Sequence, residues 1–169
     1  MKIKDIVIIG MLSAILITVQ VVLAFLPNIE LVSLLIILYT LVLGRKALYI
    51  IYVFAIVEGL VYGVGLWWFN YLYVWTVLYL VVRLLRNQQS ALLWAIVSGG
   101  FGLSFGALCS IPYFITGGIP SGMAYWVAGI PFDLIHGASN FGIALGVFVP
   151  FHYVMKNMKK EYNTQSSSH

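Results

Sequence analysis

The sequence Ile6–Leu26, IVIIGMLSAILITVQVVLAFL, decides the fold class because it is an unbroken apolar run of the length that a membrane span needs. A helix rises 1.5 Å per residue, so about 20 residues cross the roughly 30 Å of hydrocarbon in a bilayer. Lys2 and Lys4 precede the run, and Pro27 follows it as a turn signal. No small-residue cleavage site follows it, so we expect a retained membrane helix and not a signal peptide.

The basic residues indicate how the rest of the chain crosses the membrane. Lys and Arg stay on the cytoplasmic side because translocating a hydrated cation is costly, so an even number of spans must separate successive basic clusters. The intervals 5–44, 47–82 and 87–155 each have room for two spans. The sequence therefore predicts an all-α integral membrane protein with six transmembrane helices and cytoplasmic N and C termini. The clusters are Lys2 and Lys4; Arg45 and Lys46; Arg83 and Arg86; and Lys156, Lys159 and Lys160.

Composition agrees with a membrane protein. The chain is 62% hydrophobic and only 8% charged, which is too little polar cover for a soluble domain of 169 residues. The net charge of +4 arises from the cytoplasmic clusters, so it indicates orientation and contact with lipid headgroups, not nucleic-acid binding. Cys109 is the single cysteine, which excludes a disulfide framework. We expect a multi-pass protein of a prokaryotic cell membrane.

Turn signals give the expected helix boundaries. The outer loop Thr116–Gly122 should end the fifth helix, and a helix over Met123–Met155 would be roughly 50 Å long, which exceeds the bilayer. We therefore expect Met123–Ile130 to form an outer lid or interfacial turn and the sixth helix to start near Pro131. The earlier helices are expected at about 5–26, 30–43, 47–66, 68–85 and 91–114.

The expected domain organisation is simple. Residues 1–155 should form a single six-helix membrane domain, and residues 156–169 a cytoplasmic polar tail. Asn163–His169 is polar and low in complexity, so we expect it to be disordered.

Three acidic residues lie away from the cytoplasmic ends: Glu30, Glu58 and Asp133. A carboxylate at membrane depth is costly, so each is a functional candidate. The helical rise places all three in the outer half of the bilayer. Asp133, His136 and Asn140 follow an i, i+3, i+7 spacing, which puts them on one helix face that should look into the bundle or a water-filled cavity.

The same outer half is rich in Tyr and Trp. Some of these rings must belong to the ordinary interfacial belt, but others are suited to line a pocket. Aromatic walls with a few carboxylate, imidazole and amide groups are how proteins hold a flat heterocycle. The predicted substrate-binding residues are Asn28, Glu30, Glu58, Tyr62, Trp67, Trp68, Asn70, Tyr71, Tyr113, Trp126, Asp133, His136 and Asn140.

Each polar residue also has a purely structural interpretation. Glu58 could be protonated or hydrogen-bonded to a tyrosine, and Asp133 could cap a helix that starts at Pro131. His136 could pair with Asp133 or a backbone carbonyl. Gln20 and Asn140 could be interhelical hydrogen-bonding residues.

Small residues indicate close helix contacts. Gly10 and Ala14 form a small-xxx-small pair on the inner part of the first helix, which suits either packing or a docking face for another membrane protein. In the fifth helix a row of small residues favours internal packing; the row is Ser98, Gly99, Gly102 and Gly106.

Several catalytic motifs are missing from the sequence. It contains no Gly-x-x-x-x-Gly-Lys-Ser/Thr phosphate loop, no His-Glu-x-x-His metal motif and no Gly-x-Ser-x-Gly elbow. No metal or cofactor is therefore expected. A membrane hydrolase that combines Asp133 and His136 with Ser110 or Cys109 is the enzymatic alternative.

A chain of this size, with six expected helices, an outer polar pocket and a small-residue pair on the first helix, resembles the S component of energy-coupling factor vitamin transporters. In that family an Ala-x-x-x-Ala motif contacts the transmembrane coupling subunit; Gly10 and Ala14 occupy the matching positions, with Gly as the first residue. The resemblance implies a non-enzymatic subunit that captures a B-type vitamin from outside and topples in the membrane. Two partner ABC ATPases would hydrolyse the ATP.

Two segments point to one branch of that family. Residues 27–33 and 130–136 look like a branch for cobalamin or corrinoid uptake, with thiamine, pyridoxine or a pyrimidine-type vitamin as the next choices. The alternative to a transport subunit is an intramembrane enzyme or a membrane assembly factor.

Overall fold

The computed structural model describes residues 3–167, with side chains for residues 3–160, and this part of the chain holds six α-helices and no strand. Three of them, α1, α5 and α6, are long and apolar enough to cross a membrane. The all-α prediction is thus confirmed for the described residues. The helices are α1 (Ile3–Leu23), α2 (Val32–Leu43), α3 (Lys46–Tyr62), α4 (Leu66–Leu84), α5 (Ala91–Cys109) and α6 (Ile111–Ser167).

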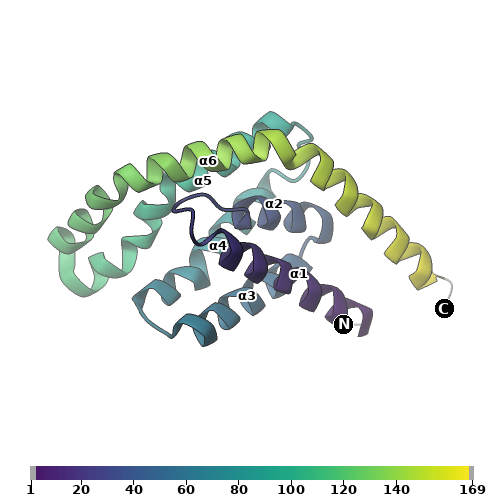
Figure 1. The fold of residues 1–169 in the computed structure, drawn as a ribbon, viewed down its shortest axis with the longest axis horizontal. Helices are drawn as coiled ribbons and strands as arrows, with labels where there is room; N and C mark the ends of the chain where they lie inside the picture. The colour runs from purple at the N-terminus through teal and green to yellow at the C-terminus, as the bar shows by residue number, and fades with distance from the viewer. Residues whose placement is uncertain (1–2, 168–169) are drawn as a thin grey trace.

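Figure 1 shows how the helices are arranged. Helices α5 and α6 lie side by side, and they are joined by a reversal at the left end of the view. The α1–α2 connection and the α3–α4 turn also lie toward the left end. The labels of the N and C ends both lie at the right end.

Helix α2 is the centre of the molecule. It has only 12 residues, almost all of them buried, and it contacts each of the other five helices. A helix that is apolar all round has no face suited to water and therefore belongs in a core. It ends at Gly44, whose φ of 61° is readily adopted only by glycine and turns the chain into α3.

The last third of the chain differs from the sequence prediction. Helix α5 ends at Cys109, and α6 begins at Ile111 and bends at Gly118, where φ is 71° and ψ is −173°. The chain is helical again through Met123–Ile130, so the predicted lid and the predicted helix start near Pro131 are both wrong. The start signal was Pro120, which lies in the first turn after the bend, where a missing N–H costs nothing.

Helix α6 also continues into the expected tail. It crosses residues 155 and 156 without a break and ends at Ser167, so the predicted disorder of Asn163–His169 is wrong as far as Ser167. Residues 168–169 lie outside the described part of the chain. From Ile119 to Ser167 the helix is roughly 70 Å long at 1.5 Å per residue, which is longer than a bilayer is thick.

Glycines bring α5 and α6 into close contact, as the row of small residues predicted. A methyl group on Gly102 would lie 2.8 Å from the backbone C and O of His136, and one on Gly99 would lie 2.9 Å from the Cβ of Phe141. Real Cβ atoms do not approach backbone atoms this closely. The two helices can therefore pack at this distance only because these positions have no side chain.

This contact predicts opposite effects for two neighbouring glycines. We expect Gly102→Ala to destabilise the fold by about 1–3 kcal/mol, because the new methyl group meets backbone that cannot move aside. Gly100→Ala is the matched control: a Cβ there meets nothing within 4 Å, and alanine favours a helix by up to about 1 kcal/mol. Thermal unfolding in detergent measures the stability of each variant. Equal stability of the two would contradict the close packing of α5 on α6.

Candidate functional site

Two adjoining cavities lie near the connection between α1 and α2. The first, which we call the His136 cavity, has a volume of about 290 Å³. The second, the Glu58 cavity, has a volume of about 280 Å³ and shares Gln20, Ala24 and Tyr71 with the first. The His136 cavity is lined by Gln20, Leu23, Ala24, Leu26, Pro27, Asn28, Ile29, Glu30, Tyr71, Trp75, Phe105 and His136. The Glu58 cavity is lined by Gln20, Ala24, Glu58, Tyr62, Trp67 and Tyr71.

A carboxylate–imidazole pair forms part of the His136 cavity. The Nε2 of His136 on α6 lies 3.3 Å from Oε1 of Glu30, in the segment before α2. The other carboxylate oxygen accepts a hydrogen bond of 2.8 Å from the backbone N–H of Ser33, in the first turn of α2. Burial raises the pKa of Glu30, but the hydrogen bonds with His136 and Ser33 outweigh it and leave that pKa below its usual value.

Further polar contacts hold the α1–α2 connection against α6. The side-chain amide of Asn140 donates to Oγ of Ser33 at 3.2 Å, and Oγ of Ser139 donates to the backbone carbonyl of Asn28 at 2.6 Å. Asn28 has a φ of 62°, a conformation that asparagine tolerates better than most residues. Asn140 therefore acts as an interhelical hydrogen-bonding residue, which is the structural alternative that its sequence position left open.

The Glu58 cavity combines an acidic group with aromatic walls. Glu58 on α3 is only 3% exposed, and its Oε1 has no hydrogen-bond partner among the described residues. The rings of Trp67 and Tyr71 meet edge to face at 5.4 Å, and Gln20 donates to Oη of Tyr71 at 3.3 Å. Within the described chain, no Lys or Arg lines either cavity.

Two of the predicted site residues on α4 pack inside the fold and do not line either cavity. Trp68 donates its indole N–H to the carbonyl of Ala55 at 2.8 Å. Asn70 accepts a hydrogen bond of 2.9 Å from Tyr73. Trp68 thus joins α4 to α3, and Asn70 orders a turn of α4 itself.

Tyr113 and Trp126 also lie away from the cavities, on either side of the bend at Gly118 in α6. Tyr113 stacks on Tyr125 at 4.1 Å between ring centroids. Trp126 is 38% exposed. Both positions suit the aromatic belt at a membrane interface better than a pocket wall.

Asp133 is separated from Glu58. Its Oδ1 accepts a hydrogen bond of 2.9 Å from the backbone N–H of Gly106 on α5, and its Oδ2 is buried without a partner among the described residues. Since α6 is helical well before Pro131, the interpretation of Asp133 as an N-terminal cap is wrong. The carboxylate faces α5, while His136 and Asn140 face the start of α2.

In the hydrolase alternative, no hydrogen bond among the described residues joins His136 to Asp133, Ser110 or Cys109. Ser110 donates its hydroxyl to the carbonyl of Ala107 at 2.7 Å, and His136 faces Glu30. Nowhere in the described residues do three or more His, Cys, Asp or Glu side chains come together as a metal site would need.

Comparison with protein-family models, with curated proteins and with solved structures finds no match to this chain.

Sequence reasoning missed two aromatic members of the His136 cavity. Trp75 lies one helical turn after Tyr71, a spacing that puts both rings on one face of α4, so that spacing was an available signal. Its indole N–H is buried and has no partner among the described residues. Phe105 of α5 meets the ring of His136 at 5.0 Å, and nothing local in the sequence marked it.

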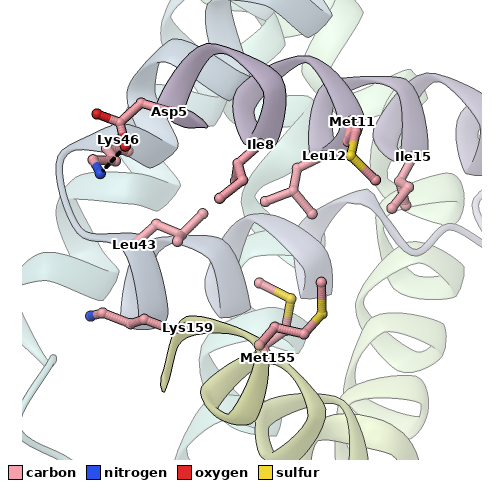
Figure 2. A pocket seen from close by; sticks show the side chains of 10 residues that line it. Asp5, Ile8, Met11, Leu12, Ile15, Leu43, Lys46, Met155 and Lys159 are labelled. Carbon is pink, nitrogen blue, oxygen red and sulfur yellow. Dashed lines mark hydrogen bonds and ion pairs between the residues drawn. The ribbon is translucent and has the colours of Figure 1, made fainter. Parts of the chain in front are cut away.

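A third, apolar groove of about 120 Å³ lies at the other end of the molecule, between α1 and the later part of α6. Figure 2 shows Ile8, Leu12 and Ile15 of α1 facing Met155 of α6 across it. At its edge Lys46 pairs with Asp5 at 2.5 Å, and Lys159 donates to the carbonyl of Val42 at 2.5 Å. Its lining is nearly all hydrocarbon and thioether, which does not suit a polar ligand.

The Glu30–His136 pair predicts coupled effects on stability. We expect the variants Glu30→Ala and His136→Ala to be non-additive by about 0.5–3 kcal/mol, because each removes the same interaction. Glu30→Ala with Ser104→Ala is the control, since Ser104 bonds only to its own helix and this pair should be additive. Unfolding free energies in detergent of the two single variants and the double variant complete each double-mutant cycle. Additive effects of Glu30→Ala and His136→Ala would contradict a stabilising contact between the two side chains.

The same pair predicts a pH dependence. Because folding lowers the pKa of Glu30, the carboxylate stabilises the fold above its ordinary value of 4.5, and this contribution is lost as the pH falls through the lower folded value. The unfolding temperature should therefore fall more steeply between neutral and acidic pH for the wild type than for Glu30→Ala. If the unfolding temperatures of the two proteins fall in parallel with pH, the lowered pKa of Glu30 is contradicted.

Proposed function

We propose that this chain is the substrate-capture subunit of an energy-coupling factor vitamin importer, a multi-pass protein of a prokaryotic cell membrane. The observation that carries the proposal is the pair of adjoining cavities, which join a carboxylate–imidazole pair, a buried unpartnered carboxylate and aromatic walls. Cavities of this composition hold flat polar molecules. Both cavities lie near the α1–α2 connection.

The position of the basic residues supports six spans with cytoplasmic ends. Lys46 contacts Asp5, which follows Lys4 in the chain, and Lys159 contacts α2 near its end. Arg83 Nη1 lies beside Gly44, 3.5 Å from the position of an added Cβ. Basic clusters that are far apart in the sequence thus meet at one end of the molecule, as retention on one side of a membrane requires.

A docking face for a coupling subunit is available on α1. Gly10 and Ala14 are both exposed, and a Cβ on Gly10 would meet nothing within 4 Å. Small residues on an apolar helix face let a partner helix approach closely. Because the chain has no phosphate loop, hydrolysis of ATP is assigned to two partner ATPases.

The size of the cavities favours a small vitamin. Taken separately, the cavities of about 290 and 280 Å³ each lie just below the roughly 300–1,000 Å³ range of small-molecule sites. This supports a heterocycle of one or two rings, such as thiamine, pyridoxine or a pyrimidine-type vitamin. It supports cobalamin less, although the resemblance of residues 27–33 and 130–136 favoured a corrinoid.

The proposal is tested by separating binding from transport. We expect the purified wild type to bind a vitamin without ATP, and Gly10→Trp and Ala14→Trp to bind it equally well while cells that carry them lose uptake. A bulky ring on this face keeps a partner helix away but does not touch the cavities. Equilibrium titration with thiamine, pyridoxine, riboflavin and cobalamin gives the affinities, and labelled vitamin in cells gives the uptake.

Val22→Trp is the matched control, because Val22 is also an exposed apolar residue of α1 but lies near its other end. It should retain uptake. Normal uptake in both the Gly10 and Ala14 variants would reject the docking face. A folded wild type that binds no vitamin, or that alone turns over a substrate, would favour the enzyme alternative.

A further inference from the structure

The charge environment of Glu58 is unusual for a buried residue. Glu58 is 3% exposed, and one of its carboxyl oxygens has no partner among the described residues. The side chains that share its cavity are Gln20, Tyr62, Trp67 and Tyr71 together with Ala24. Gln20 already donates to Tyr71. Buried carboxylates in proteins are normally paired with a cation or fully hydrogen-bonded, because an isolated one is costly.

No basic side chain of the described chain takes that role. The Lys and Arg clusters gather at the opposite end of the molecule, where Lys46, Lys159 and Arg83 lie near the α2–α3 turn. The only imidazole that lines either cavity, His136, faces Glu30. If Glu58 is ionised, the positive charge that pairs with it comes from a bound molecule, since no described Lys or Arg lines its cavity.

The walls of the Glu58 cavity suit such a charge. Tyr and Trp rings attract a cation through the negative face of the π system, by an amount that grows when water is excluded. Trp67, Tyr71 and Tyr62 line the same cavity as Glu58. Aromatic rings around one acidic group are a typical arrangement for a nitrogen cation.

The adjoining cavity indicates what the rest of the ligand offers. Trp75 is 2% exposed and its Nε1–H has no acceptor among the described residues, although Trp75 lines the His136 cavity. Because Gln20 and Tyr71 belong to both cavities, one molecule of one or two rings can reach both. A hydrogen-bond acceptor on that molecule would satisfy the indole.

We propose that the ligand is a flat nitrogen heterocycle that carries a positive charge, with its cationic group against Glu58 and a ring or side-group acceptor toward Trp75. This rests on the proposed function and adds its substrate class. Neutral flavins and corrinoids fall outside that class. Glu58 is then the residue that selects by charge, while Glu30 and His136 shape the adjoining wall.

The test uses pairs of ligands that differ mainly in charge. At neutral pH, 4-amino-5-aminomethyl-2-methylpyrimidine carries an ammonium group where 4-amino-5-hydroxymethyl-2-methylpyrimidine carries a hydroxyl, and pyridoxamine and pyridoxine form a second pair. Thiamine is a third, permanent cation. We expect wild type in detergent to prefer at least one cation over its neutral partner by about tenfold or more, the range of one charged hydrogen bond.

The variant Glu58→Gln keeps the shape of the side chain and removes its charge. It should weaken binding of that cation by about 10- to 100-fold and change binding of the neutral partner by less than about threefold. The matched control is Asp133→Asn, since Asp133 is also a buried carboxylate with an unpartnered oxygen but lines neither cavity. It should bind both ligands like the wild type.

Circular dichroism and gel filtration show that each variant is folded. If wild type binds a neutral vitamin better than every cation, or if Glu58→Gln binds the cation unchanged, the charge assignment is overturned while the capture function stands. Equal losses in Glu58→Gln and Asp133→Asn would also overturn it. If folded wild type binds no vitamin of either kind, the capture function itself fails, and the charge assignment fails with it.

Discussion

The close packing of α5 against α6 determines where the candidate site lies. Helices in lipid gain no hydrophobic energy from meeting each other, so their contact depends on tight packing and on hydrogen bonds. Gly102 lets the backbone of α6 approach until an added methyl group would touch the carbonyl of His136. The glycine contact thereby fixes the turn of α6 that directs His136 toward Glu30. A change in this spacing would move the imidazole and with it one wall of a cavity.

The start of α2 supplies the second constraint. The first N–H groups of a helix have no partner within that helix, and where they are buried another group must accept from them. Glu30 accepts from the N–H of Ser33, and Asn140 of α6 donates to the hydroxyl of the same serine. Glu30, which satisfies this helix end, therefore also lines the His136 cavity. Part of the polarity of the site is a requirement of the fold, and Glu58 stands apart because no such requirement explains it.

The first four helices could be predicted within a few residues because apolar runs end at charges or at glycines with positive φ, such as Gly44 and Gly63. The end of the chain could not be predicted, since Pro120, Pro131 and Pro150 all lie inside α6 and a proline signals a helix start only when the preceding turn is known.

The helical spacing of Asp133 and His136 puts them on one stripe of α6, but α6 lies between two neighbouring helices. The two side chains therefore meet different partners. Trp67 and Trp68 are adjacent in the sequence, yet about 100° apart around α4; one lines a cavity and the other binds Ala55.

The segregation of charge along the molecule limits what the site can bind. In the proposed orientation the basic residues mark the cytoplasmic end, and a Lys or Arg near the outer cavities would weaken the signal that sets the topology. Carboxylates contribute little to that signal, so they can be placed at the outer end without the same cost. A short membrane chain with an outward site thus has acidic and aromatic groups available for recognition but few cations. Such a site is better suited to ligands that bring their own positive charge and hydrogen-bond donors than to phosphates or carboxylates.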